Sequence, residues 1–128
     1  WNCKADLDIY VTDPCGIVIG PRDKKQTCRG SVGTLDIDAN QDATNHPENA
    51  RTDPQENVFW SKANSGKYRV KINCCPLHRG MNLKSTTIQF TLVIEARGKR
   101  TVKTGSITGS YSRGDDVELK DFYVHVID

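Results

Sequence analysis

The amino-acid sequence predicts an all-β protein, an antiparallel β-sandwich of the jelly-roll or immunoglobulin-like type with seven or eight strands. Most of the chain alternates apolar and polar residues with a period of two, most clearly over Lys67 to Cys74 and Thr86 to Glu95. Turn-forming residues separate these segments at short intervals, and no stretch has the helical period of about 3.6 residues. An apolar fraction of 36% suits sheets that bury one face and leave the other in water.

The size of the chain predicts one domain. A chain of 128 residues can bury a sizeable core, so residues 1–128 are expected to form a single domain. No apolar run approaches the length of a transmembrane helix and no signal peptide is visible, so we expect no membrane insertion. Because the sequence begins at Trp1 and not at Met, we interpret it as a mature protein or an excised domain.

The expected elements follow from these patterns in chain order. Strands are expected at residues 6–12, 17–19, 33–38, 56–60, 67–74, 86–95, 101–107 and 117–127. Asp13-Pro14-Cys15-Gly16 has the residues of a type I turn, and Arg97-Gly98-Lys99 has those of a hairpin turn. Polar loops are expected at 22–31 and 39–56. A change of phase in the last strand predicts a β-bulge near Lys120 and Asp121.

The first strand carries an unusual pair of acidic residues. Its apolar residues, at odd positions from Leu7 to Val11, share one face, and Asp6 and Asp8 share the other face, which we expect to be exposed. Two carboxylates this close repel each other unless a cation or several hydrogen-bond donors lie between them.

The same alternation recurs at Leu35-Asp36-Ile37-Asp38, and two interpretations of it remain open. If the two strands meet at one end of the sandwich, their carboxylates converge, and a calcium ion, which prefers carboxylate and carbonyl oxygens, removes the repulsion. The candidate metal ligands are then Asp6, Asp8, Asp36, Asp38, Asn40 and Glu56. Otherwise these are separate solvated carboxylates on an exposed face, some of them turn formers.

The charge is divided unevenly along the chain. Residues 1–65 carry 7 Lys or Arg and 10 Asp or Glu, whereas residues 66–128 carry 11 and 6. In the basic half, Lys67, Arg69 and Lys71 alternate, either as the solvated face of a strand or as a patch for an anionic partner. No aromatic residues interleave with them as a platform for bases would require, so no nucleic-acid partner is expected.

The five cysteines are Cys3, Cys15, Cys28, Cys74 and Cys75. They form no Cys-x-x-Cys pair, which argues against a structural zinc site. A disulfide between Cys15 and Cys28 is the first expectation, and one between Cys3 and either Cys74 or Cys75 is the second. Two disulfides would suit an exported protein, extracellular or periplasmic, although a fully reduced chain remains an alternative.

No catalytic residues are predicted, and we expect that the protein is not an enzyme. Cys75 and His78 lack a third group to orient them, and the carboxylates lack the aromatic platforms of a glycosidase cleft. The histidines His46, His78 and His125 have no metal-ligand spacing. Arg113-Gly114-Asp115 is an adhesion tripeptide in a predicted loop, and such a tripeptide often arises by chance.

Four ordered blocks of residues resemble a bacterial β-sandwich family known mainly as a domain of unknown function. Its members share the run A-D-L-D-L-x-V-x-D-P-x-G, which Ala5 to Gly16 resembles. The later blocks L-D-x-D, E-N-x-x-W and G-x-Y-x-V-x-V resemble residues 35–38, 56–60 and 66–72 in the same order. The resemblance covers about residues 1–75.

The resemblance implies a β-sandwich in an exported or surface-associated protein, often beside adhesion-like modules, and it marks the acidic positions of the blocks for attention. Tyr10 departs from the family pattern, where a His is common, and the cysteines are not part of that pattern.

Taken together, the sequence predicts a non-enzymatic binding or structural module stabilised by a calcium ion. The alternative is a metal-free domain that binds a protein or glycan through its loops or its basic face. The sequence identifies neither the ligand nor the oligomeric state.

Overall fold

The computed structural model describes residues 1, 6–39, 55–74, 85–110 and 119–126, which form an all-β structure. Its strands are β1 (Leu7–Thr12), β2 (Val18–Ile19), β3 (Lys25–Cys28), β4 (Ser31–Ile37), β5 (Asn57–Trp60), β6 (Gly66–Cys74), β7 (Ser85–Ala96), β8 (Lys99–Ser110) and β9 (Leu119–Val126). Every strand pair in these ranges is antiparallel, so the predicted all-β class with antiparallel pairing is confirmed. The described part of the chain contains no helix that could span a membrane.

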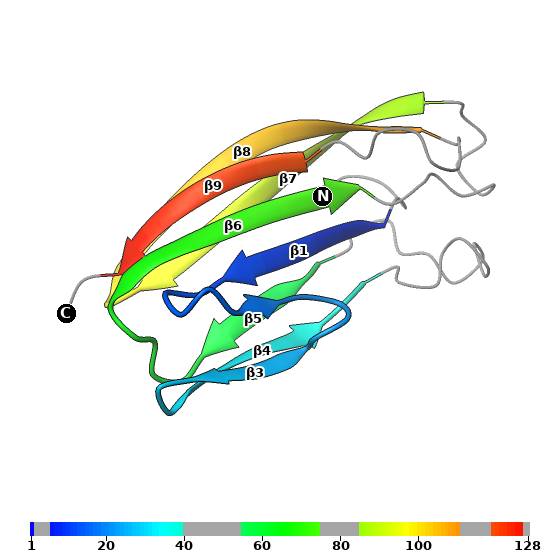
Figure 1. Ribbon diagram of the computed structural model, residues 1–128. Helices are drawn as coiled ribbons and strands as arrows, with labels where there is room; N and C mark the ends of the chain where they lie inside the picture. The colour runs from blue at the N-terminus through cyan, green and yellow to red at the C-terminus, as the bar shows by residue number, and fades with distance from the viewer. Residues whose placement is uncertain (2–5, 40–54, 75–84, 111–118, 127–128) are drawn as a thin grey trace.

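The strands form three sheets (Figure 1). A four-stranded sheet has the order β2-β1-β6-β9, a three-stranded sheet has the order β3-β4-β5, and β7 pairs with β8. β1 and β6 pair over the whole length of β1, from Leu7 opposite Cys74 to Thr12 opposite Arg69. This pair lies at the centre of the four-stranded sheet and forms the floor of the core.

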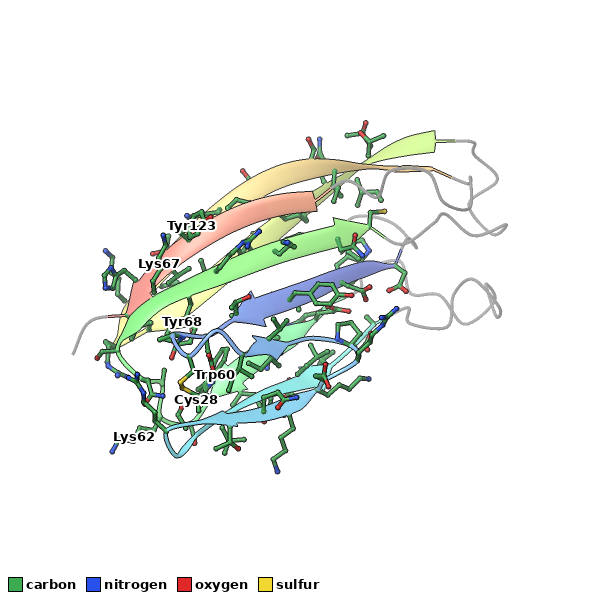
Figure 2. The ribbon with its side chains drawn as sticks, viewed as in Figure 1. Cys28, Trp60, Lys62, Lys67, Tyr68 and Tyr123 are labelled. Carbon is green, nitrogen blue, oxygen red and sulfur yellow. A yellow bond between two sulfur atoms is a disulfide. The ribbon has the colours of Figure 1, made fainter. Side chains whose placement is uncertain are left out.

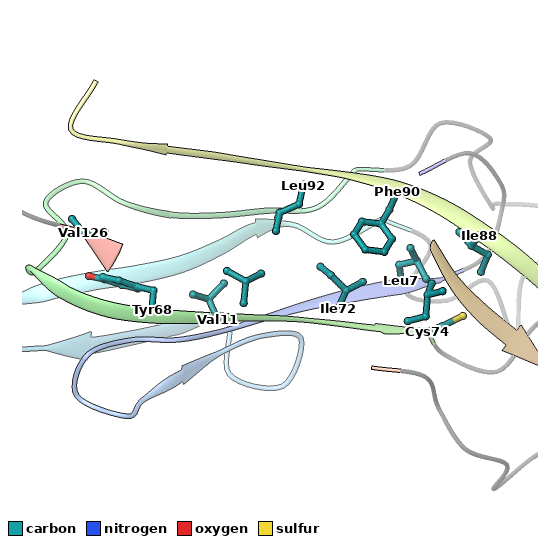
Figure 3. Packing of buried hydrophobic residues seen from close by; sticks show 11 residues of the cluster. Leu7, Val11, Tyr68, Ile72, Cys74, Ile88, Phe90, Leu92 and Val126 are labelled. Carbon is teal, nitrogen blue, oxygen red and sulfur yellow. The ribbon is translucent and has the colours of Figure 1, made fainter. Parts of the chain in front are cut away.

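The core lies between the inner face of the β1–β6 pair and the strands that cover it. The facing residues are Leu7, Val11, Tyr68, Val70, Ile72 and Cys74 from β1 and β6, and Ile88, Phe90 and Leu92 from β7 (Figure 3). β5 lies beside β7 over the same face. The contact that shows this is between the rings of Trp60 and Tyr68, which meet edge-on with centroids 5.2 Å apart. Alternation over residues 67–74 and 86–95 therefore predicted the buried positions of β6 and β7 correctly.

The structure has one described strand that the sequence did not predict. β3 lies within the predicted loop 22–31, because its sequence Lys25-Gln26-Thr27-Cys28 is polar and gives no hydrophobic period. Arg29 and Gly30 join β3 to β4, with φ angles of 48° and 78°. Two successive positive φ values define the two-residue hairpin turn that matches the twist of paired strands. The hairpin turn that the sequence did predict, at Arg97 and Gly98, has the same geometry.

The β-bulge predicted near Lys120 and Asp121 is wrong. β9 pairs with β6 in one unbroken register, from Leu119 opposite Asn73 to Val126 opposite Gly66. The predicted change of phase depended on Val117, which lies outside the described residues, and on Leu119 at the end of an edge strand. The end of an edge strand gives a weak indication of phase, because few neighbours fix which way its residues face.

The turn after β1 and the first predicted disulfide are both present. Gly16 N donates to Asp13 O at 2.9 Å, which closes the predicted turn, and Asp13 Oδ1 accepts hydrogen bonds from Cys15 N and Ile17 N. Cys15 and Cys28 form a disulfide that ties this turn to the end of β3. Of the second expected pair, Cys3 and Cys75 lie outside the described residues.

A buried glycine makes room for the indole of Trp60. Gly33 of β4 lies directly opposite Trp60 of β5, and a Cβ at Gly33 would lie 2.5 Å from an indole carbon. Real Cβ atoms essentially never come this close to another heavy atom, so the ring would have to move. The Trp60–Tyr68 contact on the floor of the core depends on this space.

We predict that Gly33→Ala lowers the free energy of unfolding by about 1–3 kcal/mol, because it overpacks the indole. Urea unfolding measures the change. In a Trp60→Leu background, where the indole is gone, the same substitution should cost much less. An equal cost in the two backgrounds would contradict the assigned contact.

Candidate metal centre

The first half of β1 leaves one edge uncovered by a strand. β2 pairs with β1 only at Val11 and Thr12, although β6 pairs with the other edge throughout. Backbone N–H groups on one edge recur at every second residue, so Ile9 presents its N–H beyond the end of β2. Glu56, the residue before β5, takes the place of a strand: its Oε2 accepts a hydrogen bond from Ile9 N at 2.7 Å. This bond brings the start of β5 to the edge of β1.

A β-bulge at Asp36 determines which carboxylate of β4 reaches the same place. Leu35 pairs with β5, and Ile37 is the next residue to do so, so Asp36 is an extra residue. The bulge reverses the alternation of faces. Leu35 is buried and Ile37 is exposed, while the side chain of Asp38 is only 5% exposed. An unbroken strand would have placed Ile37 on the inner face and Asp38 on the outer one.

Four carboxylates converge where β1, β4 and β5 meet. Asp6, Asp8, Asp38 and Glu56 each offer an oxygen, and these oxygens all lie within 4.8 Å of one another. Asp6 and Asp8 are both only 8% exposed, so the expectation that their face of the strand is exposed is wrong. The residues that end β4 and begin β5 lie against that face and exclude water from it.

A lysine lies beside this cluster. Lys24, just before β3, places its Nζ 3.0 Å from Asp38 Oδ2, and its side chain is 44% exposed. The sequence did not indicate Lys24, because it lies in a predicted loop with no motif around it. Asp38 Oδ1 and Glu56 Oε1 are both buried in the cluster. The side chains of Asp38 and Glu56 interact by a hydrogen bond, which requires a proton on one of the two carboxyl groups.

The environment of Glu56 strongly disfavours its charged form. Burial, together with the nearby charges of Asp8 and Asp38, raises the pKa of Glu56 from its ordinary value of 4.5 to about 10. The hydrogen bond from Ile9 N acts in the opposite direction but does not outweigh burial. At neutral pH and without a cation, Glu56 therefore retains its proton.

Asp36, the other described residue among the predicted ligands, does not join the cluster. Asp36 is exposed and accepts a hydrogen bond from Asn57 Nδ2 at 2.7 Å, and Asn40 lies outside the described residues. His46, His78 and Arg113-Gly114-Asp115 also lie outside them, and His125 is exposed on β9. Asp13 lies near Cys15 and Cys28, but the two sulfurs are bonded to each other and are not metal ligands.

The four carboxylates fit a hard divalent cation. Calcium takes about six to eight oxygens at about 2.3–2.6 Å, so opposite ligands of one ion are separated by about 5 Å. Oxygens that all lie within 4.8 Å of one another can therefore contact a single ion. Four carboxylates supply at most eight oxygens, of which Glu56 Oε2 is already bonded to the backbone of β1. Backbone carbonyls or water would complete the shell.

Comparison with known proteins adds no relative. No protein-family model matches this chain, and no curated protein or solved structure is significantly similar to it. The resemblance to a bacterial β-sandwich family stays a prediction, and the chemistry of the site rests on its own residues.

We predict that the metal-depleted protein loses stability as the pH rises from about 5 toward 9. Because the pKa of Glu56 is about 10 in the folded state and 4.5 ordinarily, the folded state holds more protons than the unfolded state between these values. The contribution of Glu56 to the free energy of unfolding therefore falls as the pH rises. Urea unfolding at several pH values measures the slope. Glu56→Gln should flatten it, whereas Glu95→Gln, at an exposed position, should not. An unchanged slope in Glu56→Gln would assign the effect to another group.

Proposed function

We propose that this protein is a non-enzymatic binding or structural module, stabilised by a calcium ion held by Asp6, Asp8, Asp38 and Glu56. The observation that carries the proposal is the convergence of these four carboxylates within 4.8 Å, with oxygens of Asp38 and Glu56 buried among them. Burying several carboxylates together is costly unless positive charge compensates them, which a divalent cation would supply.

The position of the cluster indicates a structural ion. Its ligands come from three separate parts of the chain: the start of β1, the end of β4 and the start of β5. An ion at this point would join the four-stranded sheet to the three-stranded sheet. At this point the bond from Ile9 N to Glu56 already joins β1 to the start of β5.

The wider architecture in this proposal is a β-sandwich in an exported or surface protein. One layer is the four-stranded sheet, and the other is made of β3-β4-β5 and β7-β8 side by side. Packing of Trp60 and of β7 residues on the same face of β6 supports this arrangement. The Cys15–Cys28 disulfide supports an oxidising compartment, extracellular or periplasmic, because such bonds are rare in the cytosol.

A second candidate function uses the outer face of the four-stranded sheet. Lys67, Arg69 and Lys71 alternate along β6 on the face opposite Tyr68 and are opposed across the ladder by β9. Lys67 Nζ lies 4.1 Å from the ring centroid of Tyr123, which is 54% exposed (Figure 2). A row of cations beside an exposed ring suits an anionic glycan, whose acidic groups and sugar faces need these two contacts.

We predict that chelation lowers the melting temperature and that calcium restores it. At a calcium concentration about one hundred times the dissociation constant, binding adds about 2.7 kcal/mol to the stability. Thermal unfolding with calcium and with chelator measures the difference. Identical melting curves in the two solutions would overturn the proposal.

A matched pair of variants tests the assigned ligands. Asp8→Asn should abolish the calcium-dependent difference, and it should stabilise the chelated protein because it removes a repelling charge. Asp36→Asn, on the neighbouring strand but outside the cluster, should keep the wild-type response. A full calcium response in Asp8→Asn would remove that residue from the site.

For the second candidate, we predict that Lys67→Glu with Lys71→Glu weakens binding to immobilised heparin about tenfold, since two surface cations are reversed. The salt concentration at elution measures the effect. The control is Lys25→Glu with Lys62→Glu. These two exposed lysines lie in β3 and just after β5, and their replacement changes the net charge equally. Equal losses in the two double variants would indicate a net-charge effect and contradict a specific face.

A further inference from the structure

A groove of 830 Å³ separates β5 from β7. Among the strands that the structure describes, β5 pairs only with β4 and β7 pairs only with β8, so each strand has one edge without a strand partner. The groove is lined by the consecutive residues 55–61 and 90–97. Successive residues of a strand point to opposite faces, so only every second residue would line the groove if a face of the strand formed its wall. Because consecutive residues line it, the edge of each strand forms the wall.

The floor of the groove is apolar and belongs to the core. Val11, Tyr68 and Val70 line it from below, and Trp60 and Leu92 line its sides. Val58 and Ile94 are only partly buried, although both pack against the core. The space therefore offers an apolar surface for side chains and two strand edges for backbone hydrogen bonds.

The outer rim of the groove is apolar as well. Phe59 of β5 is 44% exposed and Val93 of β7 is 45% exposed, on the two strands that border the groove. An exposed strand edge with apolar side chains is a site where another strand adds, unless something covers it. A strand between β5 and β7 would contact core residues with one face and this rim with the other.

The two ends of the groove differ in charge. Arg97 and Arg100 line the end beside the β7–β8 turn, where Arg97 Nη2 donates to Ala63 O at 2.7 Å. Arg100 is 66% exposed, and its Nε lies 3.8 Å from Glu95 Oε1, which is a weak pairing. Asp8 and Glu56 line the other end. An occupant with an acidic residue at the arginine end would match these charges.

We propose that the groove between β5 and β7 binds an extended segment of a partner protein, about seven or eight residues long, by β-strand addition. The segment has apolar side chains at alternate positions and an acidic residue at the end that meets Arg97 and Arg100. Main-chain hydrogen bonds to the open edges supply affinity, and the apolar floor selects the alternating pattern. This proposal does not depend on calcium, so failure of the chelation experiment leaves it standing.

Both tryptophans of the chain, Trp1 and Trp60, line the groove, so tryptophan fluorescence reports on it directly. The probe is a capped octapeptide of alternating valine and threonine that ends in two aspartates. Its control has the same side chains but carries N-methyl groups on all of its backbone nitrogens, which removes the donors to both strand edges. We expect the probe to shift the fluorescence and to slow hydrogen exchange of β5 and β7 amides at least tenfold, whereas the control does neither.

A charge exchange tests the orientation of the peptide. Arg100→Glu, at an exposed position, should weaken binding of the aspartate peptide about threefold, and a peptide ending in two lysines should regain that loss. Equal binding of the N-methylated control would overturn strand addition, as would protection of amides outside β5 and β7. A third outcome is slow exchange of the β5 and β7 amides without peptide, increasing with protein concentration and accompanied by a dimer mass. This outcome would assign the groove to a second copy of this chain and overturn the proposal.

Discussion

The burial of carboxylates where β1 meets the ends of β4 and β5 is the constraint on which the rest of this structure depends. β1 is central to the four-stranded sheet, yet half of one edge has no strand beside it. The carboxylate of Glu56 fills that position and draws β5 against β1. The same contact brings Asp38 to Asp6 and Asp8, so the joint between the sheets concentrates negative charge in a place with little water. A cation at this joint would turn an electrostatic cost into a crosslink.

The same joint explains the groove on the other side of β5. Glu56 and Trp60, at the two ends of β5, hold this strand against the β1–β6 floor. β7 contacts another part of the same floor through Phe90 and Leu92. Neither strand reaches the other, so the covering layer is divided into β3-β4-β5 and β7-β8. Proteins usually protect such edges with charge, proline or a covering segment, because open edges recruit other strands. Here the rim carries Phe59 and Val93, which favours recruitment over protection.

The sequence predicted the features that depend on local periodicity and turn chemistry. Alternation from Lys67 to Cys74 and from Thr86 to Glu95 identified β6, β7 and their buried faces, because hydrophobic burial acts on every second residue. Asp13-Pro14-Cys15-Gly16 identified its turn, and the spacing of Cys15 and Cys28 identified their disulfide. The polar strand β3 escaped prediction, since its formation depends on pairing with β4 and not on its own composition.

The sequence by itself determined the all-β class, the main strands and the acidic composition of the candidate site. Only the tertiary structure decided which carboxylates meet. Asp36 and Asp38 look equivalent in the alternating run, yet the bulge at Asp36 sends one to solvent and the other to the cluster. Asp6 and Asp8 look solvent-facing in their strand, yet the ends of β4 and β5 cover them. The physical reason is the same in both cases. The direction of a side chain follows from local alternation, but its burial depends on register and on the neighbours that folding brings against it.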